Sequence, residues 1–448
     1  MNKKLIFITL ISVFSKLSLA KIEIQTSYPM AVITAAYTWA GVGSNSKALE
    51  EILTKEFQGQ EELKKSIKTQ LENLPKSCSG KDERNDCHNS REIIVQLALE
   101  SRDLNELSKK MINVWSLKLV SGVISPIKTF AVKYEKKIWN KNEKAFRQQI
   151  ELMRNLSDKL KADDFLNDMK IFYVSNWPNW LPNVVGVYPV PAKRGHTSGS
   201  SYGHFAEQAI LLNSKEAANV LAVSFHEMAH GYYHFQDKNT QSQWAEILAK
   251  FSMRDRFILQ SLLNEGFATI IGNGIAYEMM TGSTDASPWY TDPFIEAFAR
   301  SNYDLIKKKF LDKTPLTLED FSLMISNFKK SSTDWEINPQ FYSKTFAAYF
   351  SPTHASNEVI SFMRSKHMAN SVYRFDKYEP MLKTKYDELA TFYVFLKPGE
   401  NIPSQIASFL PQKILSKNKR GLEMMKDKDR WITVVWFNDL NDLKAIFP

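Results

Sequence analysis

Two histidines and a glutamate form the stretch of this sequence that is best suited to chemistry, His226-Glu227-Met228-Ala229-His230. Side chains four residues apart lie one above the other on the same face of an α-helix. Both imidazoles can therefore reach one metal ion. Glu227 lies about 100° further round the helix, so it can touch a water at that ion without being a ligand. The plain alternative is two surface histidines on an ordinary helix.

The spacing H-E-x-x-H is the motif of zinc-dependent peptidases. A structural zinc site would want four protein ligands, usually rich in cysteine, but the two cysteines of this chain lie far upstream. A catalytic zinc site needs three protein ligands and one open position. A third ligand must therefore come from elsewhere in the chain.

The histidines need a helix that holds them at the edge of a core. Asn213 followed by Glu216 predicts a helix start with a capping box. Apolar residues then recur at helical spacing until about Tyr233, namely Ala217, Val220, Leu221, Phe225, Met228 and Ala229. The stripe buries one side of the helix.

Glu265 is the best candidate for the third ligand. A metzincin would have glycine and histidine where this chain has Tyr233 and Gln236, so that class is excluded. His234 continues the spacing, but three ligands on one straight helix spread over about 12 Å, which favours a structural role.

A second apolar helix surrounds Glu265, with Phe257, Ile258, Leu262, Phe267, Ile270 and Ile271 at helical spacing. A buried carboxylate is costly unless it is paired or bound to metal. Gly266 and Ala268 are small and let another helix approach, and Gly272 and Gly274 are expected to loosen the end of this helix. An ion pair between Glu265 and Arg254 or Arg256 is the alternative to metal binding.

The order H-E-x-x-H and then N-E-G-F-A resembles the gluzincins, most closely the alanyl-aminopeptidase-like family. The resemblance implies that His226, His230 and Glu265 hold one Zn²⁺ and that Glu227 is the general base. Tyr342, in Tyr-Ser-Lys-Thr at 342–345, matches the tyrosine of Y-x-K-G that stabilises the oxyanion, with threonine where glycine is usual. The spacing from His230 to Glu265 is longer than in the aminopeptidases, and their G-x-M-E-N stretch has no counterpart. The likeness covers short motifs between about 184 and 350.

The expected activity is peptide-bond hydrolysis by a metal-activated water, with Glu227 passing the proton to the leaving amine. The substrate is then a peptide or protein, and exopeptidase and endopeptidase both stay open. A non-catalytic zincin-like binding protein is the alternative. The presence of Glu227 argues against it, because binding alone needs no base.

Residues 1–20 read as a secretory signal, with Lys3 and Lys4 before an apolar run and cleavage after Ala20. Export to the periplasm or the medium follows, without a stable membrane anchor. Removal of three lysines lowers the net charge from +9 to +6, and no basic run interleaved with aromatics indicates nucleic acid. The oligomeric state stays open.

The two cysteines, Cys78 and Cys87, enclose a short polar loop. In an exported chain they predict one disulfide. A zinc site that includes His88 is the alternative, but the ligand set is incomplete.

The fold class expected from the periodicity is α+β and predominantly α-helical. A helical region at 21–165 precedes a thermolysin-like zincin domain at 166–355, and a helical region follows at 356–448. Predicted strands are 170–174, 184–190 and 209–212, and predicted helices include 340–350. In the zincin fold an edge strand binds the substrate backbone. If the strand at 209 is that edge, His204, Glu207 and Gln208 lie near the cleft.

Overall fold

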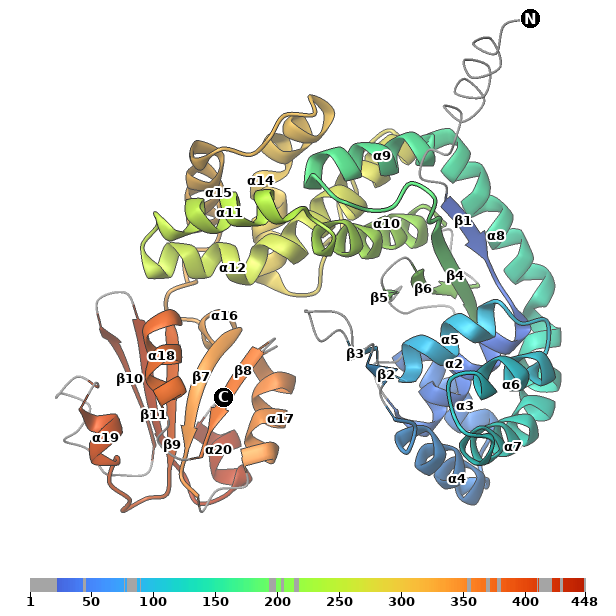
Figure 1. The fold of residues 1–448 in the computed structure, drawn as a ribbon, viewed down its shortest axis with the longest axis horizontal. Coiled ribbons are helices and arrows are strands. Elements are labelled where there is room, and N and C mark those ends of the chain that lie inside the picture. The colour runs from blue at the N-terminus through green and yellow to red at the C-terminus, as the bar shows by residue number, and fades with distance from the viewer. Residues whose placement is uncertain are drawn as a thin grey trace, which may run out of the picture. The chain divides into compact units, whose positions relative to one another are not determined.

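The computed structural model describes residues 22–42, 46–75, 77–78, 87–88, 90–192, 199–202, 205–212, 217–352, 356–367, 371–376, 380–408, 410, 421–427 and 430–446. These residues are mostly helical and include a four-stranded and a five-stranded sheet (Figure 1), which confirms the predicted α+β class with helix predominating. The expected signal segment, residues 1–20, lies outside the described residues.

The chain divides into two compact units. The first comprises Met1–Asp237, Phe267–Trp289 and Ile306–Pro315, and the second comprises Lys238–Gly266, Tyr290–Leu305 and Leu316–Pro448. One point of division falls between Gly266 and Phe267, inside helix α12 (Met253–Ala268).

The sheet of the first unit has the strand order β1-β4-β6-β5. Strands β1 (Ile22–Gln25), β4 (Asn183–Val190) and β6 (Phe205–Leu211) are parallel, and β5 (Gly199–Tyr202) pairs antiparallel with β6. The predicted strands at 184–190 and 209–212 correspond to β4 and β6. Among the described strands, the edge beside β6 is β5, so the strand at 209 is not the edge.

Helix α2 (Tyr28–Ala40) is the centre of the helices before the sheet. It is apolar on every side, and all of its residues except Tyr28 are buried. A helix of this kind belongs inside a core. Ser27 caps it by accepting from the Met30 amide at 3.1 Å, and Gly41, at φ 68°, ends it. Around it pack α3 (Lys47–Glu56), α4 (Glu61–Glu72), α5 (Ser90–Leu99) and α7 (Leu117–Tyr134), with α6 (Leu104–Ile112) against α5 and α7.

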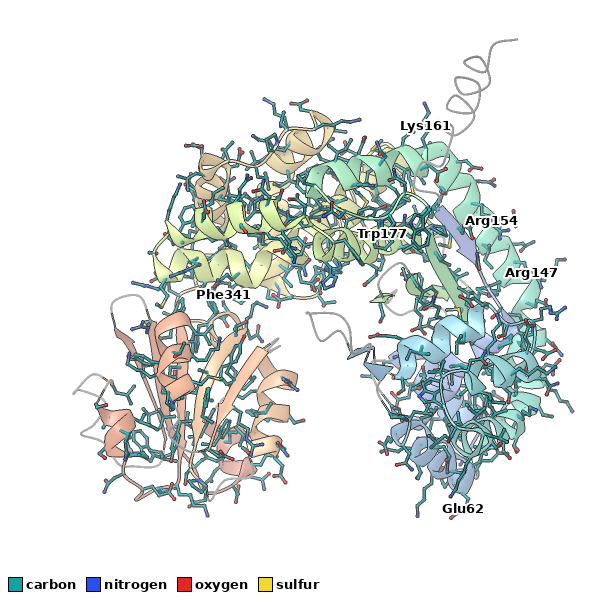
Figure 2. All side chains as sticks on the ribbon, viewed as in Figure 1. Glu62, Arg147, Arg154, Lys161, Trp177 and Phe341 are labelled. Carbon is teal, nitrogen blue, oxygen red and sulfur yellow. The ribbon has the colours of Figure 1, made fainter. Side chains whose placement is uncertain are left out.

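A long helical stretch follows, in which α7, the π-helix η1 (Glu135–Trp139) and α8 (Asn140–Leu160) run on without a break. The α8 side chain Arg154, labelled in Figure 2, donates to the Ile24 carbonyl at 3.0 Å. Asp163 accepts from the Ile22 amide at 2.9 Å. These bonds tie β1 to the helices.

The strand expected at 170–174 is wrong, because these residues form the end of helix α9 (Ala162–Tyr173). The apolar residues Phe165, Leu166, Met169, Phe172 and Tyr173 are buried at helical spacing. Asp163 and Asp164 in the first turn stabilise this helix, because their negative charges interact favourably with the positive end of its dipole. The β-type residues at 171–174 are too few to override a helix already begun.

The second unit combines helices with the five-stranded sheet, in the order β10-β11-β9-β7-β8. Strands β7 (Thr345–Phe350), β8 (Ser371–Phe375), β9 (Thr391–Leu396) and β11 (Arg430–Trp436) are parallel, and β10 (Gly421–Asp427) is antiparallel to β11. Its described helices are α11 (Lys238–Ala249), most of α12, α14 (Pro293–Leu311, which the division also cuts), α15 (Leu318–Ser331), α16 (Pro339–Tyr342), α17 (Ser356–His367), α18 (Pro380–Glu388), α19 (Ser404–Ala407) and α20 (Leu440–Ile446).

This sheet overturns two predictions. The helix expected at 340–350 is the short α16 followed by strand β7, and the region 356–448, expected to be helical, contains β8, β9, β10 and β11. Every residue of β9 is buried. Parallel strands covered on both faces are apolar at successive positions, so they lack the alternation that marks a half-buried strand.

Among the described residues, no helix is both long enough and apolar enough to cross a membrane.

Candidate metal centre

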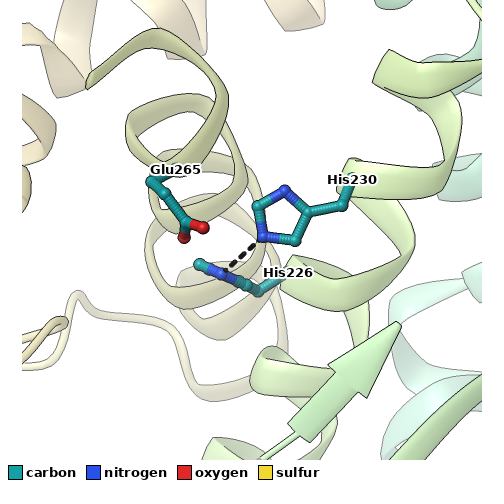
Figure 3. A group of neighbouring side chains, drawn as sticks. All are labelled: His226, His230 and Glu265. Atoms are coloured by element: carbon teal, nitrogen blue, oxygen red, sulfur yellow. Dashed lines mark hydrogen bonds between the residues drawn. The ribbon is translucent and has the colours of Figure 1, made fainter. Parts of the chain in front are cut away.

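The structure brings His226, His230 and Glu265 together (Figure 3). The histidines lie on helix α10 (Ala217–His234), and Glu265 lies on α12. One possible ligand atom from each residue lies within 4.8 Å of the other two. Thirty-five positions of sequence separate the glutamate from His230, so the chain must fold back to form this group.

The two imidazoles face one another through the same ring nitrogen. Their Nε2 atoms are 3.1 Å apart, and the rings are nearly perpendicular at 82°. Two nitrogen ligands of one tetrahedral zinc ion lie about 3.3 Å apart, given Zn–N bonds of about 2.0–2.1 Å. Without a metal, the same separation suits a hydrogen bond between neutral rings. Two imidazoles and a carboxylate are a donor set that zinc accepts, so the residues present fit this ion.

Asn273 contacts the second ring nitrogen of His226, Nδ1. The His226 Nδ1 atom lies 3.1 Å from the Asn273 Oδ1 atom, and His226 is only 5% exposed. The amide oxygen accepts, so Nδ1 carries the proton and Nε2 keeps its lone pair for a metal. Asn273 is not among the residues predicted from the sequence, because it lies eight residues beyond Glu265 and would lie on another face of a regular α-helix.

Helix α12 does not end near Gly272 as expected. It continues as the π-helix η2 (Thr269–Ala276) and then as α13 (Tyr277–Thr281). A methyl group at Gly272 would lie 2.6 Å from the Ala222 carbonyl oxygen and 2.7 Å from the His226 Cα atom. Both are backbone atoms of α10. Glycine is therefore required where η2 meets α10, and it sets their separation at His226.

Glu227 lies beside the edge strand. A methyl group at Gly199 of β5 would lie 2.7 Å from the Glu227 Cγ atom and 2.8 Å from the Gln208 Oε1 atom. The edge strand thus passes directly over the expected general base. Gln208 is buried on this side of the sheet, close to Glu227, while His204 lies outside the described residues.

Glu207 has a different environment from Gln208. It is 2% exposed, accepts from the Thr34 hydroxyl at 2.7 Å and forms an ion pair with Arg91 at 3.1 Å. Successive residues of a strand point to opposite faces. Glu207 therefore joins β6 to α2 and α5, and its contacts are structural.

Tyr342 lies in the core of the second unit. Its side chain is 2% exposed and its ring stacks on Trp431 at 6.0 Å. Burial raises the pKa of Tyr342 to about 12, so the hydroxyl keeps its proton at neutral pH. The neighbouring Lys344 is buried in an ion pair with Asp292. The Tyr342 side chain also forms a hydrogen bond with Tyr393, and the oxyanion role expected for Tyr342 stays a prediction.

The remaining candidates have other surroundings. Arg254 pairs with Glu336 at 3.1 Å. The ion pair of Glu265 with Arg254 or Arg256, which was the alternative to metal binding, stays a prediction. His234 is exposed at the end of α10. Cys78 in β2 (Ser77–Cys78) lies opposite Cys87 in β3 (Cys87–His88) in an antiparallel backbone pair. Their side chains lie outside the described part, so the disulfide and the alternative with His88 stay predictions.

No family model, no curated protein and no solved structure matches this chain.

Proposed function

We propose that this protein is an exported zinc-dependent metallopeptidase of the gluzincin kind. The observation that carries the proposal is the meeting of His226, His230 and Glu265, which lie on two helices and offer two nitrogens and a carboxylate oxygen to one point. Chance could supply the pentapeptide of α10, but it does not also explain a glutamate brought to the same two rings.

The three ligands would hold one zinc ion. When bound, the ion supplies an acidified water and polarises a substrate carbonyl. Glu227 follows His226 on the same helix and is not a member of the ligand group, and its side chain lies against Gly199. In the proposed reaction Glu227 takes the proton of the attacking water and delivers it to the leaving amine. Asn273 keeps the His226 ring in the tautomer that leaves Nε2 available.

Strand β5 is the proposed guide for the substrate backbone. It is the last described strand of its sheet on the side of β6, and an extended peptide can add to such an edge by main-chain hydrogen bonds. Its residue Gly199 lies against Glu227. A peptide aligned along β5 would therefore pass close to the general base, and the absence of a side chain at Gly199 leaves room for the Glu227 side chain.

The first experiment measures metal content and turnover together. Purified protein is analysed for zinc and incubated with a broad peptide library, as wild type, Glu227→Gln, Glu265→Ala and the control His234→Ala. We expect one zinc per chain in wild type, in Glu227→Gln and in the control. Glu265→Ala loses zinc, and Glu227→Gln loses turnover alone. The control keeps both, because His234 is exposed one turn beyond His230.

Each contrary outcome has a clear meaning. Wild type without zinc rejects the metal site, and a fully metallated Glu265→Ala protein rejects this ligand. Stoichiometric zinc without any hydrolysis favours the zincin-like binding protein. Equal rates for wild type and Glu227→Gln remove this residue from the mechanism. Comparing a free peptide with its N-acetylated form then separates exopeptidase from endopeptidase.

A further inference from the structure

The helix that carries Glu265 changes its geometry within one turn of this residue. After Ala268 the hydrogen bonds become those of the π-helix η2, which includes Asn273. In a regular α-helix, a residue eight positions beyond Glu265 would lie about 80° away from it round the axis. The i→i+5 bonds of a π-helix make each residue turn by less, which returns Asn273 towards the face of Glu265. Glu265 and Asn273 can then both face the histidines of α10.

The contact of Asn273 with α10 is closely constrained. Its Oδ1 atom lies 3.1 Å from the His226 Nδ1 atom, and its neighbour Gly272 packs on the backbone of His226 itself. The His226 ring is therefore held by an acceptor on a helix that packs closely against the backbone of α10. The opposite nitrogen of the same ring points at His230.

We propose that Asn273 is a positioning residue for the metal ligand His226, and that the π-helix η2 serves to bring it there. This inference rests on the proposed zinc site. Asn273 fixes the proton of His226 on Nδ1 and the orientation of the ring, and through both it sets the affinity of the site for its ion. The acceptor is a neutral amide. A carboxylate at this place would make the imidazole a stronger ligand, so this chain holds its metal less tightly than its ligand set allows.

The test is the zinc dissociation constant of the folded, metal-free protein, measured by competition with a chromogenic chelator. Asn273→Leu keeps the size of the side chain and removes the acceptor, and we expect binding to weaken about 10-fold to 100-fold. Asn273→Asp keeps the acceptor and adds charge, and we expect binding at least as tight as in wild type. A role limited to packing predicts the same loss for both variants.

Asn183→Leu is the matched control. Asn183 is also buried, and its amide donates to the Tyr232 hydroxyl of α10 at 3.0 Å, but it touches no proposed ligand. We expect a less stable protein with unchanged zinc affinity. A second readout is the NMR spectrum of histidine labelled with ¹³C and ¹⁵N in the metal-free protein. It should show His226 protonated at Nδ1 in wild type and in Asn273→Asp, and a mixture of tautomers in Asn273→Leu.

Wild-type zinc affinity in Asn273→Leu would overturn the inference. If that variant does not fold, Asn273→Asp decides alone, and binding weaker than in wild type would overturn it. Wild type that binds no zinc at all would instead reject the proposed function. The two failures are therefore distinguishable.

Discussion

Replacing Gly272 by alanine tests the packing that holds the candidate site together. The new methyl carbon would lie 2.6 Å from the Ala222 oxygen and 2.7 Å from the His226 Cα atom. Favourable contacts between carbon atoms are at about 3.5–4.0 Å, so η2 and α10 must separate by roughly 1 Å. The clash is with backbone atoms, which cannot rotate away as a side chain could.

Two measurable consequences follow. Overpacking of this kind typically costs about 1–3 kcal/mol, which lowers the Tm by roughly 2–12 °C for a domain of about 250 residues. The same displacement carries Asn273 away from the His226 ring and disturbs the approach of Glu265. We therefore expect zinc affinity to fall about 10-fold to 100-fold, as for loss of a supporting partner.

The assay combines calorimetry of the metal-free protein with chelator competition at a temperature where every variant is folded. Gly186→Ala is the control, because its methyl group would lie 2.7 Å from the Phe205 Cζ atom and 2.9 Å from the Met30 methyl carbon, away from the ligands. It should lower the Tm and leave zinc affinity unchanged. Wild-type Tm and affinity in Gly272→Ala would refute the idea that this close approach fixes the metal group.

Three further variants test separate parts of the structure. Gly199→Ala should keep zinc and lose at least 10-fold in turnover, because its methyl group would displace the Glu227 side chain. Steady-state kinetics of the metallated protein measure this loss. Unchanged kinetics would show that the contact between Gly199 and Glu227 does not matter for turnover. Tyr342→Phe keeps the ring stacked on Trp431 but removes the hydrogen bond with Tyr393, so the free energy of unfolding should fall by only about 1 kcal/mol. Turnover should fall about 10²-fold to 10³-fold if the hydroxyl serves the oxyanion. Full turnover would leave Tyr342 only its packing role. Glu207→Gln breaks a buried ion pair and should cost about 3–5 kcal/mol in urea unfolding without changing zinc affinity; a change in affinity would connect Glu207 to the metal group.

The sequence determined the local parts of the candidate site. Four-residue spacing puts His226 and His230 on one helical face, and the apolar stripe between Ala217 and Ala229 predicts the helix that the structure shows as α10. The same reasoning identified Glu265 as a carboxylate that needs a partner. These conclusions depend only on the helical period and on the cost of burying charge, and both act within a few turns of the chain.

Only the tertiary structure decided which distant residues meet. The place of Asn273 depends on a π-helix, and no periodicity in the sequence reports one. The edge strand is β5 rather than the strand at 209, because strand order depends on pairing between segments that are not local. The strands of the C-terminal sheet are predicted from the sequence to be helical, because burial on both faces removes the alternation that would reveal a strand. The helical period of the sequence predicts each helix, whereas the close approach of α10 to η2 depends on Gly272, which packs against backbone atoms of Ala222 and His226, 50 and 46 residues earlier in the chain.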